Sequence, residues 1–242
     1  MISHPSPNFE ARRDGAKPSL IILHGTWTDT IEESLGFLTN ASPPEGQGRV
    51  SAHYLIDRDG TVYAMVDESM RAWHAGESHW RGISDVNSHS IGIELQNAGT
   101  KHIIPEPYDP RQIDALIVLM KDIIARLNID LENVLAHSDV APQRKDDPGE
   151  HFPWRVLGAA GVAVWPDESR AWTETVNDLL SSEESLMNAV QGWGYDPSLE
   201  MKVIMKAFNR RFVPEVFLGG VDDIKTLRAK RLAALWAKKL GI

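Results

Sequence analysis

The stretch SLIILH, residues 19–24, carries apolar side chains on both of its alternating faces before it reaches a histidine. Because successive side chains of a strand point to opposite faces of the sheet, this run predicts a central strand that is covered on both sides. SIGIEL (90–95) has the same short, apolar character. NVLAH (133–137) does too, and like the first run it ends in a histidine. We therefore expect a buried sheet at the centre of the protein.

The segments between these runs predict the rest of the architecture. SAHYLIDRDGTVYAMV (51–66) indicates two strands joined by a tight turn at Asp59 and Gly60. TDTIEESLGFLT (28–39) and DPRQIDALIVLMKDIIARLN (109–128) have the apolar spacing of amphipathic helices. Since strands and helices alternate irregularly around one hairpin, we expect an α/β fold with a mixed β-sheet flanked by helices.

The last 62 residues differ in character from the rest of the chain. Three amphipathic helical patterns separated by Pro and Gly predict a small three-helix bundle. The segment from residue 181 to residue 242 holds ten basic and seven acidic residues and is net +3, whereas the whole chain is net −9. This contrast, next to the polar SSEES at 181–185, predicts two domains, 1–180 and 181–242.

Composition excludes several classes of protein. The 242 residues include no cysteine, so disulfides and thiolate metal ligands are excluded. A net charge of −9 argues against general binding of nucleic acid. The sequence contains no run of 18 apolar residues, which is the pattern that would predict a membrane span. The first 19 residues are polar and show no signal peptide, so we expect a cytoplasmic protein. The alternative is a periplasmic protein whose export signal has been removed from this sequence.

Three polar residues lie at or near the ends of the apolar runs: His24, Glu94 and His137. Side chains at strand ends leave the packed sheet and meet a cleft, which is where α/β folds present their chemistry. A single histidine in such a place is usually a structural residue with a satisfied hydrogen bond. Two of them beside an Asp-rich loop indicate a metal site.

The loop QRKDDPG (143–149) can provide a third ligand. Pro148 biases Asp147 toward an extended conformation, in which residues two apart point the same way. Lys145 and Asp147 then face one side, and Asp146 faces the other as a solvated carboxylate. Two imidazoles and one carboxylate suit Zn²⁺ and leave a fourth position for water, as hydrolytic zinc sites require.

Glu94 and Lys145 are the candidate catalytic residues beside this metal. A carboxylate within an apolar strand is costly unless it has a use, so Glu94 is a candidate general base; the alternative is a buried partner for a lysine or the backbone. Lys145 can stabilise negative charge that develops on a carbonyl oxygen, or it can be a solvated loop lysine.

Four motifs, in this order, resemble the zinc-dependent type 2 N-acetylmuramoyl-L-alanine amidases of the AmpD and AmiD kind, which are related in fold to peptidoglycan recognition proteins. The resemblance implies one Zn²⁺ per chain on His24, His137 and Asp147, with Glu94 and Lys145 catalytic. It also implies cleavage of the amide between L-alanine and N-acetylmuramic acid or its 1,6-anhydro form. The motifs are SPNFEARRDGAKPSLIILHGTW (6–27), SAHYLIDRDGTVYAMVDESMRAWHAG (51–76), SIGIEL (90–95) and AHSDVAPQRKDDPG (136–149).

The resemblance also suggests partners and substrate contacts. In the family the loop RAWHAG (71–76) lines the substrate cleft, so Trp73 and His74 are implied contacts, and Arg71 is either a partner for a stem-peptide carboxylate or a surface arginine. The expected partners are peptidoglycan fragments or muropeptides. The C-terminal segment resembles the helical peptidoglycan-binding module of AmiD-like proteins. Two hypotheses compete with this one. The first is a non-catalytic muropeptide-binding protein. The second is a zinc peptidase of unrelated fold, against which the absence of an HExxH motif argues.

Overall fold

The computed structural model describes residues 1–102, 105–167, 182–219 and 224–240. The strands are β1 (Ile2–Ser3), β2 (Phe9–Ala11), β3 (Leu20–Gly25), β4 (Tyr54–Ile56), β5 (Val62–Ala64), β6 (Met70–Ala72), β7 (Ser90–Leu95) and β8 (Val134–Ala136). The helices are α1 (Ile31–Thr39), α2 (Val86–His89), α3 (Pro110–Leu127), α4 (His137–Val140), α5 (Trp154–Ala159), α7 (Glu183–Trp193), α8 (Met201–Phe212), α9 (Glu215–Leu218) and α10 (Ile224–Leu240).

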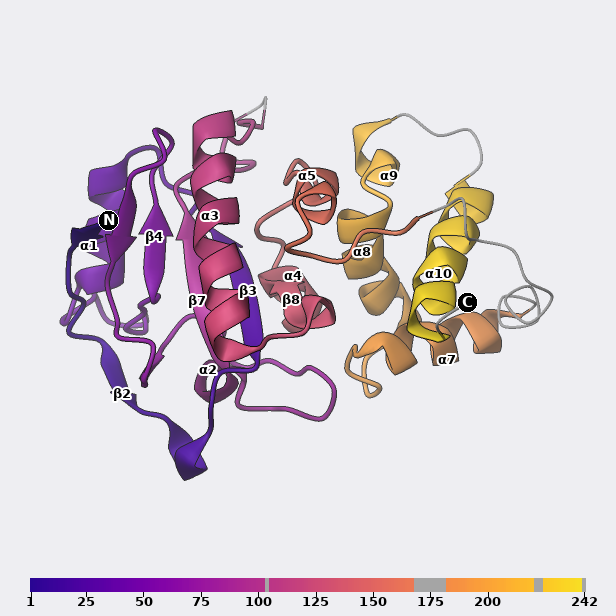
Figure 1. Cartoon of the computed structure of the whole chain (residues 1–242), viewed down its shortest axis with the longest axis horizontal. Helices are drawn as coiled ribbons and strands as arrows, with labels where there is room; N and C mark the ends of the chain where they lie inside the picture. The colour runs from indigo at the N-terminus through magenta and orange to yellow at the C-terminus, as the bar shows by residue number, and fades with distance from the viewer. Residues whose placement is uncertain (103–104, 168–181, 220–223, 241–242) are drawn as a thin grey trace.

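Six strands in the described ranges form one mixed sheet in the order β1-β5-β4-β7-β3-β8 (Figure 1). β3 lies between β7 and β8 and runs parallel to both, and β4 also runs parallel to β7. β4 and β5 are the antiparallel hairpin predicted around Gly60. β2 and β6 pair separately as an antiparallel ribbon. The predicted α/β class, a mixed sheet flanked by helices, is confirmed.

The two faces of β3 are both buried, as its apolar run predicts. Ile21 and Leu23 belong to one apolar cluster together with the buried stripe of α3, which lies over the sheet in Figure 1. Leu20 and Ile22 belong to a second cluster, on the opposite face of the strand, together with Trp80. Because neither face meets water, a polar side chain on this strand is placed where the strand ends.

The starts of α1 and α3 and the end of α3 follow the local sequence signals. The Thr30 hydroxyl accepts a hydrogen bond from the Glu33 N–H at 3.2 Å at the start of α1. The Asp109 carboxylate accepts one from the Arg111 N–H at 2.9 Å at the start of α3. Asn128 ends α3 in the left-handed conformation, with φ 51°, which asparagine tolerates better than most residues. These caps explain where both predicted helices begin and where α3 ends.

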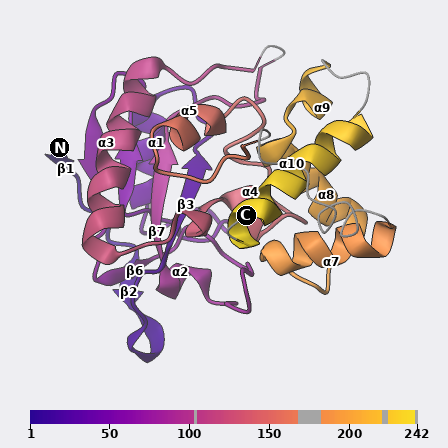
Figure 2. The same cartoon turned by 45° about the vertical axis from the view of Figure 1, so that its right-hand side comes forward.

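The three helical patterns of the C-terminal segment form α7, α8 and α10, and the short α9 lies between the last two. Figures 1 and 2 show these helices gathered on one side of the molecule, where α8 packs against α4. Trp193 and Phe208 belong to the same apolar cluster as Leu20 and Ile22 of β3. The predicted boundary near residue 180 lies outside the described residues, so the division into two domains stays a prediction.

A buried polar cluster joins α4 to the C-terminal helices. The Asp139 carboxylate accepts hydrogen bonds from Arg211 Nη1 at 2.6 Å, from the Tyr195 hydroxyl at 2.7 Å and from the Ala136 N–H at 2.9 Å. Arg211 Nη2 also donates to the Val134 carbonyl at 2.9 Å. Asp139 and Arg211 are 0% and 1% exposed, so neither charge has water to replace its partner. The C-terminal helices thus fix the turn that leads from β8 into α4.

None of the helices in the described ranges combines the length and the apolar character that a bilayer crossing requires.

We expect Arg211→Met to lower the free energy of unfolding by about 3–5 kcal/mol, because it leaves the Asp139 carboxylate buried without its counter-charge. The matched control is Arg126→Met, which breaks a partly exposed pair with Glu68 and should cost about 0–1 kcal/mol. Urea unfolding of both variants measures the difference. Equal losses in the two variants would show that the Asp139 cluster does not hold the helices to the sheet.

Candidate active site

The register of β3 against its two parallel neighbours brings the predicted polar residues together. His24 lies opposite Glu94 of β7, and Leu23 lies opposite Ala136, the last residue of β8. His137 follows at the first position of α4. Parallel strands end at the same edge of a sheet, so all three side chains are presented at one edge.

His24, His137 and Asp147 form a compact buried group. His24 Nδ1 lies 2.9 Å from His137 Nδ1 and 3.2 Å from Asp147 Oδ2, and His137 Nδ1 lies 3.0 Å from the same oxygen. The three residues are 1%, 3% and 7% exposed. Ligand atoms around a tetrahedral zinc ion stand roughly 3.3 Å apart. In the described part of the chain this group can hold a metal ion.

The outer nitrogens of both histidines already have partners, which leaves each Nδ1 free to face a metal. His137 Nε2 donates to the Ala75 carbonyl at 3.1 Å. A carbonyl oxygen can only accept, so the proton sits on Nε2 and the lone pair on Nδ1. Burial, followed by repulsion from His137, lowers the pKa of His24 to about 4, so its imidazole is neutral at pH 7. Neutral imidazoles with fixed tautomers are the form that binds metal.

His74 lies behind His24. His24 Nε2 is 3.0 Å from His74 Nδ1, and His74 Nε2 is 3.1 Å from the Ser90 hydroxyl, which donates to the Val86 carbonyl at 2.7 Å. Because the Ser90 hydroxyl donates to that carbonyl, it accepts from His74 Nε2, which leaves His74 Nδ1 to accept from His24 Nε2. Burial lowers the pKa of His74 well below its ordinary value, which keeps it a neutral acceptor. His74 therefore orients a candidate ligand.

The loop 143–149 arranges its charged residues largely as its alternation predicts. Asp147 joins the histidines, and its carbonyl accepts a hydrogen bond from the Ser138 N–H at 3.0 Å, which ties the loop to α4. The Asp146 carboxylate pairs instead with Arg210 of α8 at 2.9 Å. Lys145 lines the same cleft as the candidate ligands.

A cleft of about 350 Å³ opens over this group. Glu94 forms part of its wall, and within the described ranges its Oε2 atom is buried without a hydrogen-bond partner. Burial, followed by the negative charge of Asp147, raises the pKa of Glu94 to about 8, although Lys145 acts in the opposite direction. A carboxyl group with a pKa near neutrality can both accept and return a proton. The lining residues are His24, Gly25, Thr26, Trp27, Ser34, Phe37, Leu38, Val50, Ser51, His74, Glu94, His137, Arg144, Lys145, Asp146 and Asp147.

The structure does not bring Arg71 and Trp73 into the lining of this cleft. The Arg71 guanidinium pairs with Glu10 at 2.7 Å and with Asp85 at 2.8 Å, which ties β6 to β2 and to the start of α2. The backbone N–H of Trp73 donates to the Ser51 hydroxyl at 2.9 Å. The Trp73 ring lies under the Arg49 guanidinium, whose carbon is 4.9 Å from the ring centroid. Trp73 is thus one contact removed from the cleft.

Some residues of the site could not be predicted from the sequence. Ser90 and the Ala75 carbonyl support the histidines through contacts between distant segments, which no local pattern marks. Trp27 is different, because an aromatic residue two positions after the end of an apolar strand can be recognised in the sequence.

Comparison with known proteins relates this site to a family. The family model described as N-acetylmuramoyl-L-alanine amidase matches residues 14–150. The N-acetylmuramoyl-L-alanine amidase AmiD of Escherichia coli is 40% identical over 230 residues, which cover 84% of this chain and 78% of AmiD. The 1,6-anhydro-N-acetylmuramyl-L-alanine amidase AmpD of Salmonella typhimurium is 34% identical over 168 residues, which cover 62% of this chain and 84% of AmpD.

Solved structures give the same relationship. The complex of AmiD from E. coli with anhydro-N-acetylmuramic acid-L-Ala-D-γ-Glu-L-Lys matches with a TM-score of 0.76 and 36% identity, covering 96% of this chain and 93% of AmiD. AmpDh3 from Pseudomonas aeruginosa in complex with anhydromuramic pentapeptide matches with a TM-score of 0.76 and 29% identity, covering 94% of each chain. The family model covers more than half of the chain, and the chain therefore belongs to the N-acetylmuramoyl-L-alanine amidases, a family of hydrolases.

Proposed function

We propose that this protein is a zinc-dependent amidase that cleaves the bond between L-alanine and N-acetylmuramic acid, or its 1,6-anhydro form, in peptidoglycan fragments. The observation that carries the proposal is the buried group of His24, His137 and Asp147 opening into a cleft beside Glu94. Two relatives with similar structures are known in complex with anhydromuramyl peptides, which supports this class of substrate.

His24, His137 and Asp147 would hold one zinc ion per chain. Two imidazole nitrogens and one carboxylate oxygen are a common ligand set of catalytic zinc, with the fourth position left for water or substrate. The ion, when bound, supplies a Lewis acid that polarises a carbonyl and lowers the pKa of water to about 7. The contacts of His24 with His74 and of His137 with Ala75 would keep both rings in orientation.

Glu94 would move the proton during hydrolysis. Its carboxylate takes a proton from the attacking water as the new C–O bond forms on the carbonyl carbon. The same carboxyl then gives that proton to the alanine nitrogen as the C–N bond breaks, so the products are a carboxylic acid and an amine. Its burial and its lack of a hydrogen-bond partner for Oε2 in the described ranges leave it available for this exchange.

Lys145 would stabilise the negative charge that develops on the carbonyl oxygen. It shares the cleft with Glu94, and its ammonium group is compact enough to approach that oxygen from the loop. Among the implied substrate contacts, His74 is a positioning residue for His24 by its geometry, and Arg71 and Trp73 have no contact in the cleft that supports a binding role. The cytoplasmic location, with the periplasm as its alternative, stays a prediction.

A non-catalytic muropeptide-binding protein remains the alternative function. Such a protein has no need of a metal ligand set or of a proton acceptor. The presence of all three candidate ligands together with Glu94 therefore favours the enzyme.

We expect His137→Ala to abolish tight zinc binding, because a three-ligand site has no spare contact. His74→Ala retains the ligands but removes the acceptor of His24, so zinc affinity should fall about 10–100-fold. His4→Ala, which changes a histidine outside the cleft, is the matched control. Metal analysis and competition with a chromophoric chelator measure occupancy and affinity. Full zinc occupancy in His137→Ala would contradict the ligand assignment.

We expect the wild-type protein to release the tripeptide from anhydro-N-acetylmuramic acid-L-Ala-D-γ-Glu-L-Lys. Hydrolysis should cease when a chelator is added and resume when zinc is restored. Mass analysis of the products measures this. Binding of the substrate without turnover would favour the recognition protein instead.

Variants in the same assay separate the two catalytic roles. Glu94→Gln should keep zinc and lose about 10²–10⁴-fold in turnover, and Lys145→Ala about 10²–10³-fold. Lys121→Ala, an exposed lysine of α3 outside the lining of the cleft, is the control and should stay near the wild-type rate. A near-normal rate in a zinc-loaded Glu94 or Lys145 variant would make that residue structural only.

A further inference from the structure

Trp27 stands between two cavities. It follows the end of β3, three residues after His24, and lines the cleft above the candidate metal ligands. It also lines a neighbouring cavity, on whose wall Glu106, Glu150 and His151 lie. The residue is 36% exposed, so core packing alone does not account for its position. A large aromatic side chain shared by two adjoining cavities is placed to touch any molecule that extends from one to the other.

The backbone of Trp27 is strained. Its φ is +52°, in the left-handed region, which is uncommon for residues other than glycine and most uncommon for bulky ones. Such a conformation persists only where the surrounding structure enforces it, and it clusters at functional sites. Because about a third of the tryptophan stays exposed, core packing alone does not explain why this strained conformation is kept.

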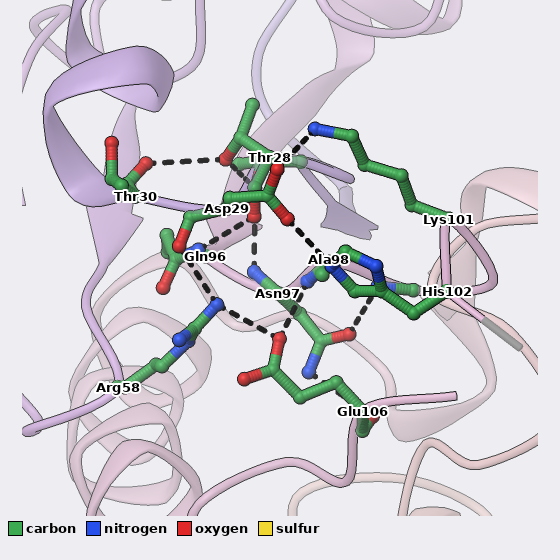
Figure 3. A network of polar contacts seen from close by, with 12 residues as sticks. Thr28, Asp29, Thr30, Arg58, Gln96, Asn97, Ala98, Lys101, His102 and Glu106 are labelled. Carbon is green, nitrogen blue, oxygen red and sulfur yellow. Dashed lines mark hydrogen bonds and ion pairs between the residues drawn. The ribbon is translucent and has the colours of Figure 1, made fainter. Parts of the chain in front are cut away.

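The residues on both sides of Trp27 are held by hydrogen bonds, many of which Figure 3 shows. The Thr28 carbonyl accepts from Gln96 Nε2 at 2.7 Å, and the Asp29 carbonyl accepts from Arg58 Nη2 at 3.0 Å. On the other side, the Thr26 hydroxyl accepts from the Asn97 N–H at 3.3 Å. These bonds fix the chain before and after Trp27.

The loop that follows β7 is held in turn to the segment around Asp29 (Figure 3). Lys101 pairs with the Asp29 carboxylate, and His102 Nε2 lies 2.8 Å from it. Glu106 pairs with Arg58 at 2.9 Å and accepts from the Ala98 N–H at 2.7 Å. The network thus joins the loop after β3 to the loop after β7, the two strands that carry His24 and Glu94.

Gly99 completes the setting of the indole. A Cβ atom at this position would collide with the Trp27 ring, so the backbone at Gly99 forms a close wall for it. No hydrogen bond to the indole N–H occurs among the described residues, and that donor remains available to a ligand. A rigid aromatic ring with a free donor can bind a ligand at little cost in conformational entropy.

We propose that Trp27 is a substrate-binding residue, a preorganised platform that covers the stem peptide between the scissile amide and the second cavity. The choice of the peptide over the sugar follows from the two linings. Charged groups line both cavities, but Phe37, Leu38 and Val50 line only the metal cleft. Glu106, Glu150 and Arg210 line only the second cavity, where they match the ammonium group and the carboxylates of a stem peptide. This inference rests on the proposed amidase function.

The test measures binding by calorimetry with the full-length, zinc-loaded Glu94→Gln protein as parent. The two ligands are anhydro-N-acetylmuramic acid-L-Ala and anhydro-N-acetylmuramic acid-L-Ala-D-γ-Glu-L-Lys. Adding Trp27→Ala should raise Kd for the longer ligand about tenfold and change Kd for the shorter one less than twofold. Trp27→Phe should recover part of the loss. Phe9→Ala, an exposed aromatic residue of β2, is the matched control and should change neither Kd.

Trp27→Gly tests whether misfolding accounts for weaker binding by Trp27→Ala. Glycine relieves the left-handed strain, so this protein should melt no lower than its parent and still bind the longer ligand about tenfold more weakly. Unchanged affinity for the longer ligand in the Ala and Gly variants overturns the inference. Equal weakening of both ligands also overturns it, since the ring would then contact the sugar. If the parent binds neither ligand and the wild-type protein cleaves neither, the proposed function itself fails.

Discussion

The site depends on the in-register parallel pairing of β3 with β7 and β8. This pairing sets His24 beside Glu94 and ends β8 directly opposite the last apolar residues of β3, so that His137 emerges next to His24. Because side chains alternate along a strand, a slip of one residue would turn His24 or Glu94 to the opposite face of the sheet. Both faces of β3 are apolar and buried, which makes such a slip costly and keeps the candidate ligands together.

The supporting contacts then fix what the register brings together. His24 is held by His74, which in turn contacts Ser90, the first residue of β7. His137 is held by the Ala75 carbonyl. On the other side, Asp139 anchors the start of α4 to Arg211 of α8 and to Tyr195, which lies between α7 and α8. The C-terminal helices therefore support the turn that presents a candidate ligand, whatever else they bind; peptidoglycan binding by them stays a prediction.

The sequence was informative where the physics is local. Apolar runs, the apolar spacing of the two amphipathic helices and the alternation around Asp147 depend on neighbouring residues. They predicted the strands, the helices and the residues that the structure gathers at one edge. Contacts between distant segments left no such pattern. The pairing of Arg71 with Glu10, the cluster of Arg211 with Asp139 and the role of His74 behind His24 each join segments at least 50 residues apart. The core that the C-terminal helices share with β3 could not be predicted for the same reason. The amphipathic pattern of a helix does not reveal which surface covers its apolar face.

In the proposed reaction, water activated at this site attacks the carbonyl carbon of the amide between muramic acid and L-alanine. Hydrolysis of anhydro-N-acetylmuramic acid-L-Ala-D-γ-Glu-L-Lys in ¹⁸O-labelled water, followed by mass spectrometry, tests it most directly. The account predicts a single ¹⁸O atom in the carboxyl group of the released muramic acid and an unlabelled tripeptide with a free alanine amine. Label in the tripeptide, cleavage at another bond, or intact substrate from zinc-loaded protein would contradict it.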